Sequence, residues 1–461
     1  MKNYYHLLAY LVITVASQRA FSQTPQWHYL GDTIIEQTWA SGILTSLEGD
    51  TPYVAYQSYD NDTSSFFWNI KRFDGTSWIP VDTNGLGYHY FEVLGTTASG
   101  VLQIAYFSFE SNKFVIKRLM GNTWVTVSES PEMTDSPYYA SYNFDDERLY
   151  IAFSDQGVAI GNKLTVWKYE AGDWSVLGQP GFSIGNAYPV IIKAENGTPW
   201  VAYEDWVLGR AGVVKKFDGN TWQSVGGQVF DGDPHGQMDF TVSNGIPYIA
   251  HADSSTQNRA NVLKFDGTSW INVGPPMFTE RTDYLKLAID ADSQEPYLLF
   301  EDYDSTFWGL SALRFDGTAW EFVGQRGFVS NSWNLEFVIN DGIPYVGYEF
   351  GPFGGGASVQ VFSPLSPSTE PQAADISFLI QPNPIVAGVL QIQITNATGM
   401  DAICQIFDSN GRLHQEKTLQ VEAGEAVHSI NVSNFPSGVY ALRLQSNNGK
   451  ECCTKRFVVA Q

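Results

Sequence analysis

A seven-membered tryptophan series limits what this chain can fold into more than any other feature of its sequence. The gaps run from 46 to 51 residues, and the members are Trp27, Trp78, Trp124, Trp174, Trp222, Trp270 and Trp320. A second series of seven, out of phase with the first, starts with "PYVAY" at Pro52 and ends with "PYVGY" at Pro344. A period near 49 residues, built from strands and turns alone, predicts propeller blades of four strands each.

One unit, residues 184 to 225, indicates the order of strands within a blade. "YPVIIKA" is the innermost strand, "PWVAYED" the second, "GVVKKF" the third and "TWQSVG" the outermost. The third and fourth strands are joined by Asp-Gly, which favours a tight hairpin because both turn positions tolerate positive φ. The tryptophan after this turn is expected to pack its ring between neighbouring blades.

The phase of the two series predicts how the ring closes. The repeats begin with a lone outermost strand around Trp27 and end with a unit that has only three strands, the last reaching Phe362. Pairing the first strand with the last unit removes two exposed sheet edges. We therefore expect an all-β, seven-bladed propeller that is closed by its N-terminal strand and followed by a small C-terminal Ig-like sandwich. The 42 glycines, 15% aromatic residues and only 16% charged residues also favour short strands over long helices.

The N-terminal residues have the composition of an export signal. Lys2 precedes a ten-residue apolar run from Leu7 to Ala16, and small residues favour a cut between Ser22 and Gln23. The run is too short to span a bilayer, and no later segment approaches eighteen apolar residues. We expect a signal peptide over 1–22, export to the periplasm and no transmembrane segment in the mature chain.

Charge and cysteine content exclude several classes of protein. Residues 23–375 carry 18 basic and 43 acidic residues, a net charge of −25, which argues against nucleic-acid or anionic-lipid partners. All three cysteines lie near the C-terminus, so no disulfide framework holds the repeats together. The role of Cys452 and Cys453 stays open.

The predicted domains are a signal peptide (1–22), a propeller (23–362), a linker rich in Pro and Ser (363–375) and a tail of short alternating strands (376–461). The tail resembles the C-terminal sorting domain of the type IX secretion system of Bacteroidetes, through "QPNP", "IFDSNGR", "FPSGVY" and "KRFVV". The residues that carry this resemblance are Pro382, Asn383, Pro384, Gly411, Arg412, Gly438, Tyr440 and Lys455. The resemblance implies that the type IX machinery is a partner and that the protein is secreted or attached to the outer surface.

Residues 25–362 resemble secreted bacterial propeller repeats of the pattern "PYVAY…FDGTSW…VG". This resemblance implies a fold and no activity. The paired glycines of kelch repeats are missing, and the sialidase Asp-box does not fit because Asp74 lies one position too close to Trp78.

Matched aspartates follow the second strand of four blades and form the first candidate ligand site: Asp155, Asp205, Asp253 and Asp302. Such a ring of carboxylates could ligate Ca²⁺ or receive a cationic ligand. Alternatively, each aspartate accepts hydrogen bonds from the backbone of its own turn. Glu204 and Glu301 stand beside two of them.

A second candidate lies in the crossing loop "DGDPHGQMD". Its side chains Asp231, Asp233, His235 and Asp239 could ligate a metal or could be an ordinary solvated turn. The identity of a cofactor stays open, with Ca²⁺ as one candidate. Phe182, Phe230, Phe278 and Phe328 recur in the crossing loops and are expected to anchor them.

No known catalytic motif accompanies these residues. The chain has no G-x-S-x-G, no HExxH and no Gly-rich phosphate loop. The sequence therefore predicts a secreted or surface-attached binding or adhesion module for a glycan or protein ligand. The alternative is a polysaccharide hydrolase or lyase on the same scaffold, and whether the chain is an enzyme stays open.

Overall fold

The computed structural model describes residues 25–35, 40–48, 51–60, 65–81, 91–157, 160–230, 237–253, 257–304, 307–330, 332–350, 356–363, 377–381, 385, 388–397, 400–408, 412–421, 424–446 and 451–459. The chain divides into a compact unit over 25–363 and a second compact unit that contains the C-terminal strands. Each unit is described by itself.

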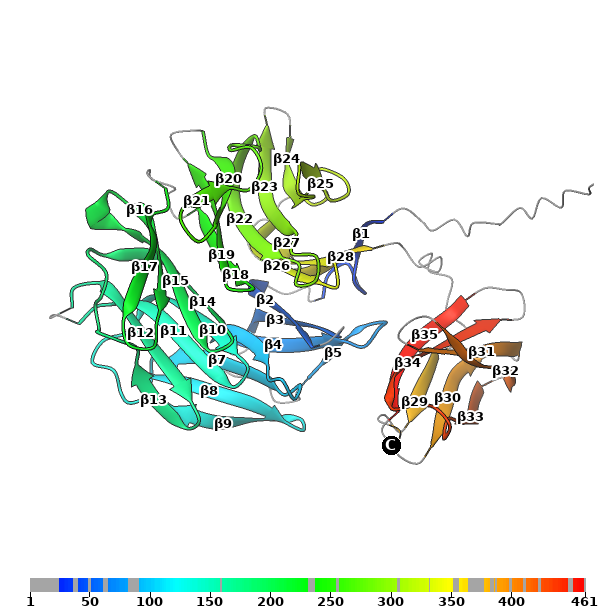
Figure 1. Cartoon of the computed structure of the whole chain (residues 1–461). Helices are drawn as coiled ribbons and strands as arrows, with labels where there is room; N and C mark the ends of the chain where they lie inside the picture. Colours follow the sequence, from blue (N-terminus) through cyan, green and yellow to red (C-terminus); the bar gives the residue numbers. More distant parts are fainter. Residues whose placement is uncertain are drawn as a thin grey trace, which may run out of the picture. The chain divides into compact units, whose positions relative to one another are not determined.

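The first unit consists of antiparallel sheets of four strands (Figure 1). Its strands are β1 (Gln26–Tyr29), β2 (Ala40–Glu48), β3 (Thr51–Asp60), β4 (Ser65–Phe73), β5 (Trp78–Pro80), β6 (Phe91–Thr96), β7 (Leu102–Ser108), β8 (Lys113–Met120), β9 (Thr123–Glu129), β10 (Tyr138–Asp145), β11 (Arg148–Asp155), β12 (Lys163–Glu170), β13 (Asp173–Val176), β14 (Ala187–Glu195), β15 (Thr198–Asp205), β16 (Ala211–Phe217), β17 (Trp222–Gln228), β18 (Met238–Ser243), β19 (Ile246–Asp253), β20 (Arg259–Phe265), β21 (Trp270–Asn272), β22 (Arg281–Ile289), β23 (Pro296–Asp304), β24 (Phe307–Phe315), β25 (Trp320–Phe322), β26 (Ser332–Asn340), β27 (Ile343–Phe350) and β28 (Ala357–Ser363). A short 3-10 turn, η1 (Trp206–Leu208), follows β15.

The sheets follow one another in sequence order and their first strands form a cycle. Strand β2 lies beside β6, β6 beside β10, β10 beside β14, β14 beside β18, β18 beside β22 and β22 beside β26, and β26 lies beside β2 again. The sheets of β18–β21 and β22–β25 are also joined by one pair, Arg259 and Arg281. This arrangement of four-stranded sheets is a β-propeller.

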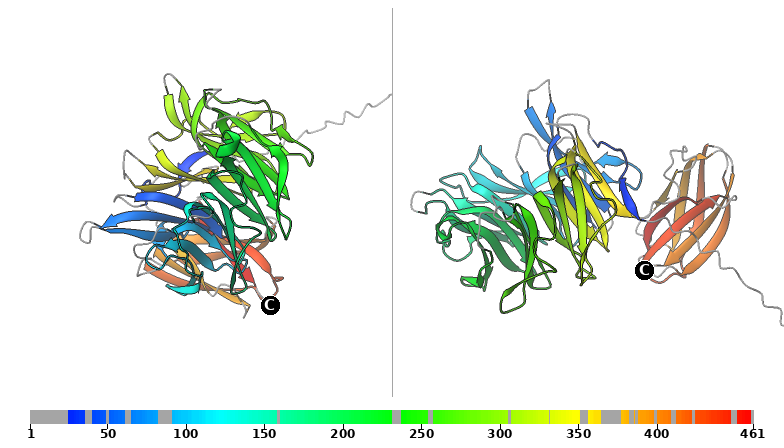
Figure 2. Two further views of the ribbon diagram at one scale, coloured as in Figure 1. Left: turned by 90° about the vertical axis from the view of Figure 1, so that its left-hand side faces the viewer. Right: turned by 90° about the horizontal axis from the view of Figure 1, so that it is seen from above.

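The N-terminal strand completes the last sheet, whose strand order is β1-β28-β27-β26. Trp27 is opposite Phe362 and Tyr29 is opposite Gln360, in antiparallel register. Figures 1 and 2 show the blue strand β1 along the edge of the yellow strands β27 and β28. The pairing predicted from the phase of the repeats is therefore confirmed.

The apolar core of this unit lies between neighbouring sheets rather than in one central mass. One cluster joins β3 and β4 to β7 and β8 through residues such as Tyr53, Ile70, Leu94 and Ile104. Another joins β27 and β28 of the last sheet to β24 through Tyr348 and Leu310. Because a sheet in the middle of such a stack is covered on both faces, its second strand is buried along its whole length, as in Leu102–Ser108.

Six of the seven repeated tryptophans donate from Nε1 to the preceding sheet, and that of Trp124 has no hydrogen-bond partner among the described residues. The indole Nε1 of Trp270 donates to the Val225 carbonyl at 2.9 Å, and that of Trp320 donates to the Val273 carbonyl at 2.8 Å. Trp27 makes the same bond to the Val323 carbonyl at 2.7 Å, so the N-terminal strand is held in the same way as the internal ones. The ring also packs on a glycine of the preceding sheet, such as Gly274 against Trp320.

Three of the recurring loop phenylalanines stack on these tryptophans. Phe328 stacks on Trp27 with ring centroids 4.2 Å apart, and Phe278 stacks on Trp320 at 4.5 Å. Phe182 stacks on Trp222 at 4.9 Å, whereas Phe230 stacks on His251. The crossing loops are thus anchored on the same tryptophans that link the sheets.

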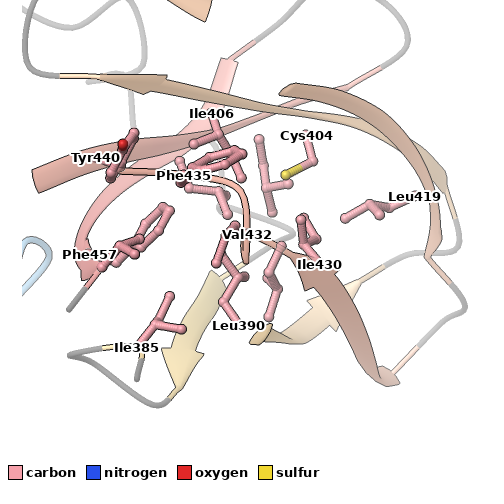
Figure 3. Packing of buried hydrophobic residues seen from close by; sticks show 14 of the residues in the cluster. Ile385, Leu390, Cys404, Ile406, Leu419, Ile430, Val432, Phe435, Tyr440 and Phe457 are labelled. Carbon is pink, nitrogen blue, oxygen red and sulfur yellow. The ribbon is translucent and has the colours of Figure 1, made fainter. Parts of the chain in front are cut away.

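The second unit has two antiparallel sheets around one apolar core. Their strands are β29 (Ser377–Gln381), β30 (Val389–Ala397), β31 (Met400–Asp408), β32 (Leu413–Val421), β33 (Gly424–Asn431), β34 (Gly438–Ser446) and β35 (Glu451–Val459), in the orders β29-β30-β33 and β32-β31-β34-β35. Figure 3 shows Leu390, Ile406 and Ile430 packed together with Phe457. The Cys404 sulfur lies in this core, and burial raises the pKa of its thiol to about 12.

Candidate functional site

The propeller sheets have two ends of different character. We call the end with the hairpins between first and second strands and between third and fourth strands the turn face. We call the other end, with the connections from second to third strands and from each sheet to the next, the loop face. The candidate aspartates follow the second strands and therefore belong to the loop face.

Two of the four candidate aspartates are buried and fully engaged within the protein. The Asp205 carboxylate accepts from the backbone N–H groups of Ile184, Gly185 and Val207 at 3.0 to 3.1 Å. The Asp302 carboxylate binds the Arg326 guanidinium at both oxygens, at 2.5 and 2.7 Å. Both carboxylates hold crossing loops in place, because Ile184 and Arg326 belong to those loops.

The other two aspartates differ again. Asp155 is half-buried and accepts from the Gly157 N–H at 3.0 Å and the Thr165 hydroxyl at 3.1 Å. Asp253 ends β19, and its side chain lies outside the described residues. The four positions share a place in the repeat but not a set of partners, and ligand binding by them stays a prediction.

Glutamates near the ends of three second strands are also buried. Glu204 and Glu301 precede Asp205 and Asp302, and Glu349 lies near the end of β27. Glu204 accepts from the Arg210 guanidinium at 3.0 Å, and Glu349 accepts from the Asn334 amide at 2.5 Å. Glu301 accepts from the Tyr303 hydroxyl at 2.6 Å. Burial raises the pKa of Glu301 and of Glu349, and in Glu301 the nearby Asp283 carboxylate adds to the effect.

The structure describes only part of the predicted metal loop. Asp231, Asp233 and His235 lie outside the described residues. Asp239 lies on β18 and accepts from the backbone N–H groups of Phe240 and Leu287 at 2.9 and 2.7 Å. Within the described ranges there is no group of three or more His, Cys, Asp or Glu side chains that could hold a metal ion. The Ca²⁺ assignment stays a prediction.

The first strands carry β-bulges near the loop face. The register shifts after Tyr138 in β10, after Asp283 in β22 and after Trp333 in β26. The bulges place Tyr139, Tyr284 and Asn334 at φ of 50°, 46° and 49°, a region that residues other than Gly and Asn rarely adopt. Such strained positions gather at functional sites.

Exposed aromatic side chains are a feature of the loop face whose individual residues the sequence did not single out. Those with more than a third of their surface exposed are Phe109, Tyr138, Tyr139, Trp206, Tyr284 and Trp308. Tyr139 stands between Tyr138 and Tyr188, with ring centroids 3.7 Å from each. An available signal was their position, since they occupy the segments that differ from one repeat to the next.

In the C-terminal unit, the residues predicted to carry the sorting motif are described in part. The Tyr440 ring is buried, stacks on Phe457 and donates its hydroxyl to the Pro436 carbonyl at 2.9 Å. Arg412 donates its N–H to Asp408 in the turn after β31, and Gly438 begins β34. Lys455 lies opposite Leu442 in the β34–β35 register. Pro382, Asn383, Pro384 and Gly411 lie outside the described residues, as do Ser22 and Gln23 of the predicted cleavage site.

Comparison with protein families finds one match. Residues 379–460 match the family of the secretion system C-terminal sorting domain. The tail therefore indicates a secreted or cell-surface protein that interacts with the type IX machinery. No curated protein matches the chain.

Solved structures similar to the chain include PorZ, an essential surface component of the type-IX secretion system of Porphyromonas gingivalis. It is 14% identical with a TM-score of 0.42, and the match covers 91% of this chain and 59% of that chain. The β-propeller domain of the Trilobed protease from Pyrococcus furiosus is 11% identical with a TM-score of 0.46, over 71% of this chain and 96% of that one. SapL1 lectin in complex with alpha methyl fucoside is 13% identical with a TM-score of 0.42, over 63% and 97%.

Across the described part of the chain, no helix is both long enough and apolar enough to cross a membrane.

Proposed function

We propose that the first unit is a seven-bladed propeller and that the tail is an Ig-like sandwich. The blade count is supported by the cycle of first strands from β2 to β26 and by the apolar cluster that joins Val54 and Trp78 to Val359. The Ig-like assignment is supported by the Tyr440 hydroxyl, which bonds to the backbone four residues upstream as in a tyrosine corner.

The propeller is a binding module of a secreted or surface-attached protein, and its ligand is a glycan held at the loop face. The observation that carries this proposal is the set of exposed aromatic rings on that face, two of them, Tyr139 and Tyr284, on strained bulges. Aromatic rings with nearby polar groups bind the apolar faces of sugar rings, and rigid side chains do so at a low entropic cost.

The carboxylates of the same face serve mainly as its scaffold. Asp205 and Asp302 tie the crossing loops to the second strands, so the aromatic residues are held on rigid supports. Asp155 and Asp253 are proposed as additional ligand contacts beside the aromatic residues.

A polysaccharide hydrolase or lyase is the second candidate, and one observation favours it. Glu301 is a buried carboxyl group whose pKa is raised beside a second carboxylate, Asp283. A carboxyl group with a raised pKa, close to a second carboxyl group, is an arrangement that general acid catalysis uses. Turnover of any polysaccharide by the purified protein would favour this candidate over simple binding.

A glycan array tests the binding function. The purified full-length protein is compared with a variant in which Tyr138, Tyr139 and Tyr284 are alanine. Truncation of aromatic anchors is expected to weaken binding by about tenfold or more. Phe322→Ala, on an outermost strand away from the loop face, is the matched control. Binding of a protein partner in place of any glycan, or equal binding by the triple variant, would contradict the proposal.

Export is proposed to follow the order signal peptide, periplasm, type IX machinery. Residues 1–22 are removed at Ser22 and Gln23, and residues 376–461 then direct the protein across the outer membrane. The sorting-domain match over 379–460 supports the second step. A chain that lacks 377–461 is expected to stay in the periplasm, and fractionation followed by immunoblotting measures this. Normal secretion of the truncated chain would overturn the assignment.

A further inference from the structure

The loop-face ends of β23 and β24 carry an aromatic pair, Tyr303 opposite Trp308. Tyr303 and Trp308 stack with ring centroids 5.7 Å apart and an interplanar angle of 13°. Trp308 is 36% exposed, so one side of the pair is open to solvent. An exposed indole ring held by a second ring is a rigid, flat and apolar surface.

A buried carboxyl group lies beside this pair. Glu301 is 1% exposed, and its Oε2 accepts from the Tyr303 hydroxyl at 2.6 Å. Its Oε1 is buried and has no hydrogen-bond partner among the described residues. A buried polar atom without a partner costs free energy, and such atoms call for an explanation.

Further polar groups stand at the same place. The Arg281 guanidinium lies over the Tyr303 ring, 5.3 Å from its centroid, and binds the Asp283 carboxylate at 3.2 Å. The Asn258 amide donates to Asp283 at 3.4 Å. Donors and acceptors from β22 and from the loop before β20 therefore surround the aromatic pair.

The equivalent glutamates of two other sheets are occupied differently. Glu204 binds the Arg210 guanidinium, and Glu349 binds the Asn334 amide. Glu301 instead accepts from the Tyr303 hydroxyl at one oxygen and has the Trp308 side chain beside its carboxyl group. The three glutamates therefore have three different partners, and the exposed aromatic pair stands beside Glu301.

We propose that this cluster is a subsite for a neutral monosaccharide unit, which stacks on Trp308 and hydrogen-bonds to Glu301 through a ring hydroxyl. Arg281 and Asp283 bind further hydroxyls of the same unit. The proposal rests on the proposed glycan-binding function and names the subsite within it.

Burial and the Asp283 carboxylate raise the pKa of Glu301, and the Tyr303 and Trp308 side chains oppose this rise. A carboxyl group that is more readily protonated can both donate to and accept from a sugar hydroxyl.

Binding of methyl glycosides tests the subsite. The full-length protein is titrated with the methyl glycosides of glucose, galactose, mannose and fucose, and saturation-transfer NMR measures binding. Trp308→Ala is expected to weaken the tightest of these interactions by about tenfold or more, and Glu301→Ala by a similar factor. Glu301→Gln keeps a donor and an acceptor at that place and is expected to bind within about threefold of the parent.

Ile271→Ala is the control, because Ile271 is an exposed apolar residue of the outermost strand β21, outside the loop-face aromatic set. Trp308 is a surface position, so this variant reports on the subsite even if Glu301→Ala does not fold. Parent-like binding by Trp308→Ala would overturn the subsite while the glycan-binding function stands. If no glycoside of the panel binds, the subsite proposal is wrong, and the glycan array then decides separately whether a glycan binds elsewhere.

Discussion

The turn face and the loop face of the propeller use the same residue type in different ways. At the turn face, Asp218, Asp266 and Asp316 each accept two backbone N–H groups of their own turn at 2.8 to 2.9 Å. At the loop face, Asp205 binds backbone N–H groups of a crossing loop, whereas Asp302 binds an arginine. At the turn face these aspartates have the same hydrogen-bond partners in each repeat, and these bonds stabilise the fold. At the loop face the partners of the aspartates differ from sheet to sheet, so each sheet has a different surface there.

Deletion of the closing strand β1 is expected to have the largest effect on stability. Deletion of residues 23–31 removes β1 and the bond from Trp27 to the Val323 carbonyl, and it leaves the edge of β28 unpaired. We expect a melting temperature lower by well over about 5 °C, or loss of the soluble fold. Circular dichroism measures the melt. Gln26→Ala, at an exposed position of β1, is the control, and an unchanged melt of the deletion would contradict ring closure.

Substitution of two tryptophans compares how much a ring between sheets and a ring on the loop face contribute to stability. Trp320→Ala removes a ring that stacks on Phe278 and donates to Val273, so we expect a loss of about 3–5 kcal/mol in the free energy of unfolding. Trp206 is 52% exposed, and Trp206→Ala is expected to change that free energy by less than about 1 kcal/mol. Urea denaturation measures both. Equal losses would mean that the loop face is as structural as the sheet interfaces.

Two glycines separate backbone strain from close packing. Gly274 has φ of +77°, and a Cβ there would lie 2.7 Å from Phe315 Cε2. Gly267 has φ of +100° in the Asp-Gly turn, with nothing within 4 Å of such a Cβ. Gly267→Ala is expected to cost about 1 kcal/mol from backbone strain alone. Gly274→Ala should cost about 1–3 kcal/mol more, because of the clash. Equal costs in urea denaturation would argue against tight packing at the sheet interface.

The pH dependence of stability is expected to have opposite signs at the two faces, and this effect is the smallest. Hydrogen bonds from Ser269 and Thr268 lower the pKa of Asp266 below its ordinary 3.8, so its stabilisation is complete above that value and is lost as the pH falls through the lowered pKa. Burial raises the pKa of Glu301 above its ordinary 4.5, so stability falls as the pH rises from 4.5 through the raised pKa.

Melting temperatures measured against pH separate the two cases. Asp266→Asn should be less stable than the parent at neutral pH, with a difference that shrinks in acid. Glu301→Gln should match the parent at about pH 4 and gain on it as the pH rises. Differences that run in the same direction for both variants would contradict the contrast between the faces.

Much of the propeller was predictable because it is repetitive. The tryptophan series and the "PYVAY" series each have seven members, and each repeat predicts the same order of strands. Because the two series are out of phase, they also predict that Trp27 pairs with the last unit. The candidate site was less predictable. Asp205 and Asp302 occupy equivalent positions, yet their partners Ile184 and Arg326 come from loops whose sequences differ, and periodicity carries no information about such loops.

The sequence by itself determined the strand order, the Asp-Gly turns, the pairing of the first strand with the last unit and the sorting tail, because each depends on local pattern or on a repeated period. Only the tertiary structure decided that five of the seven tryptophans bond to carbonyls of the preceding sheet and that Glu301 lies near Tyr303 and Asp283. These contacts join side chains from different strands and loops, and their distances depend on how the sheets twist and pack.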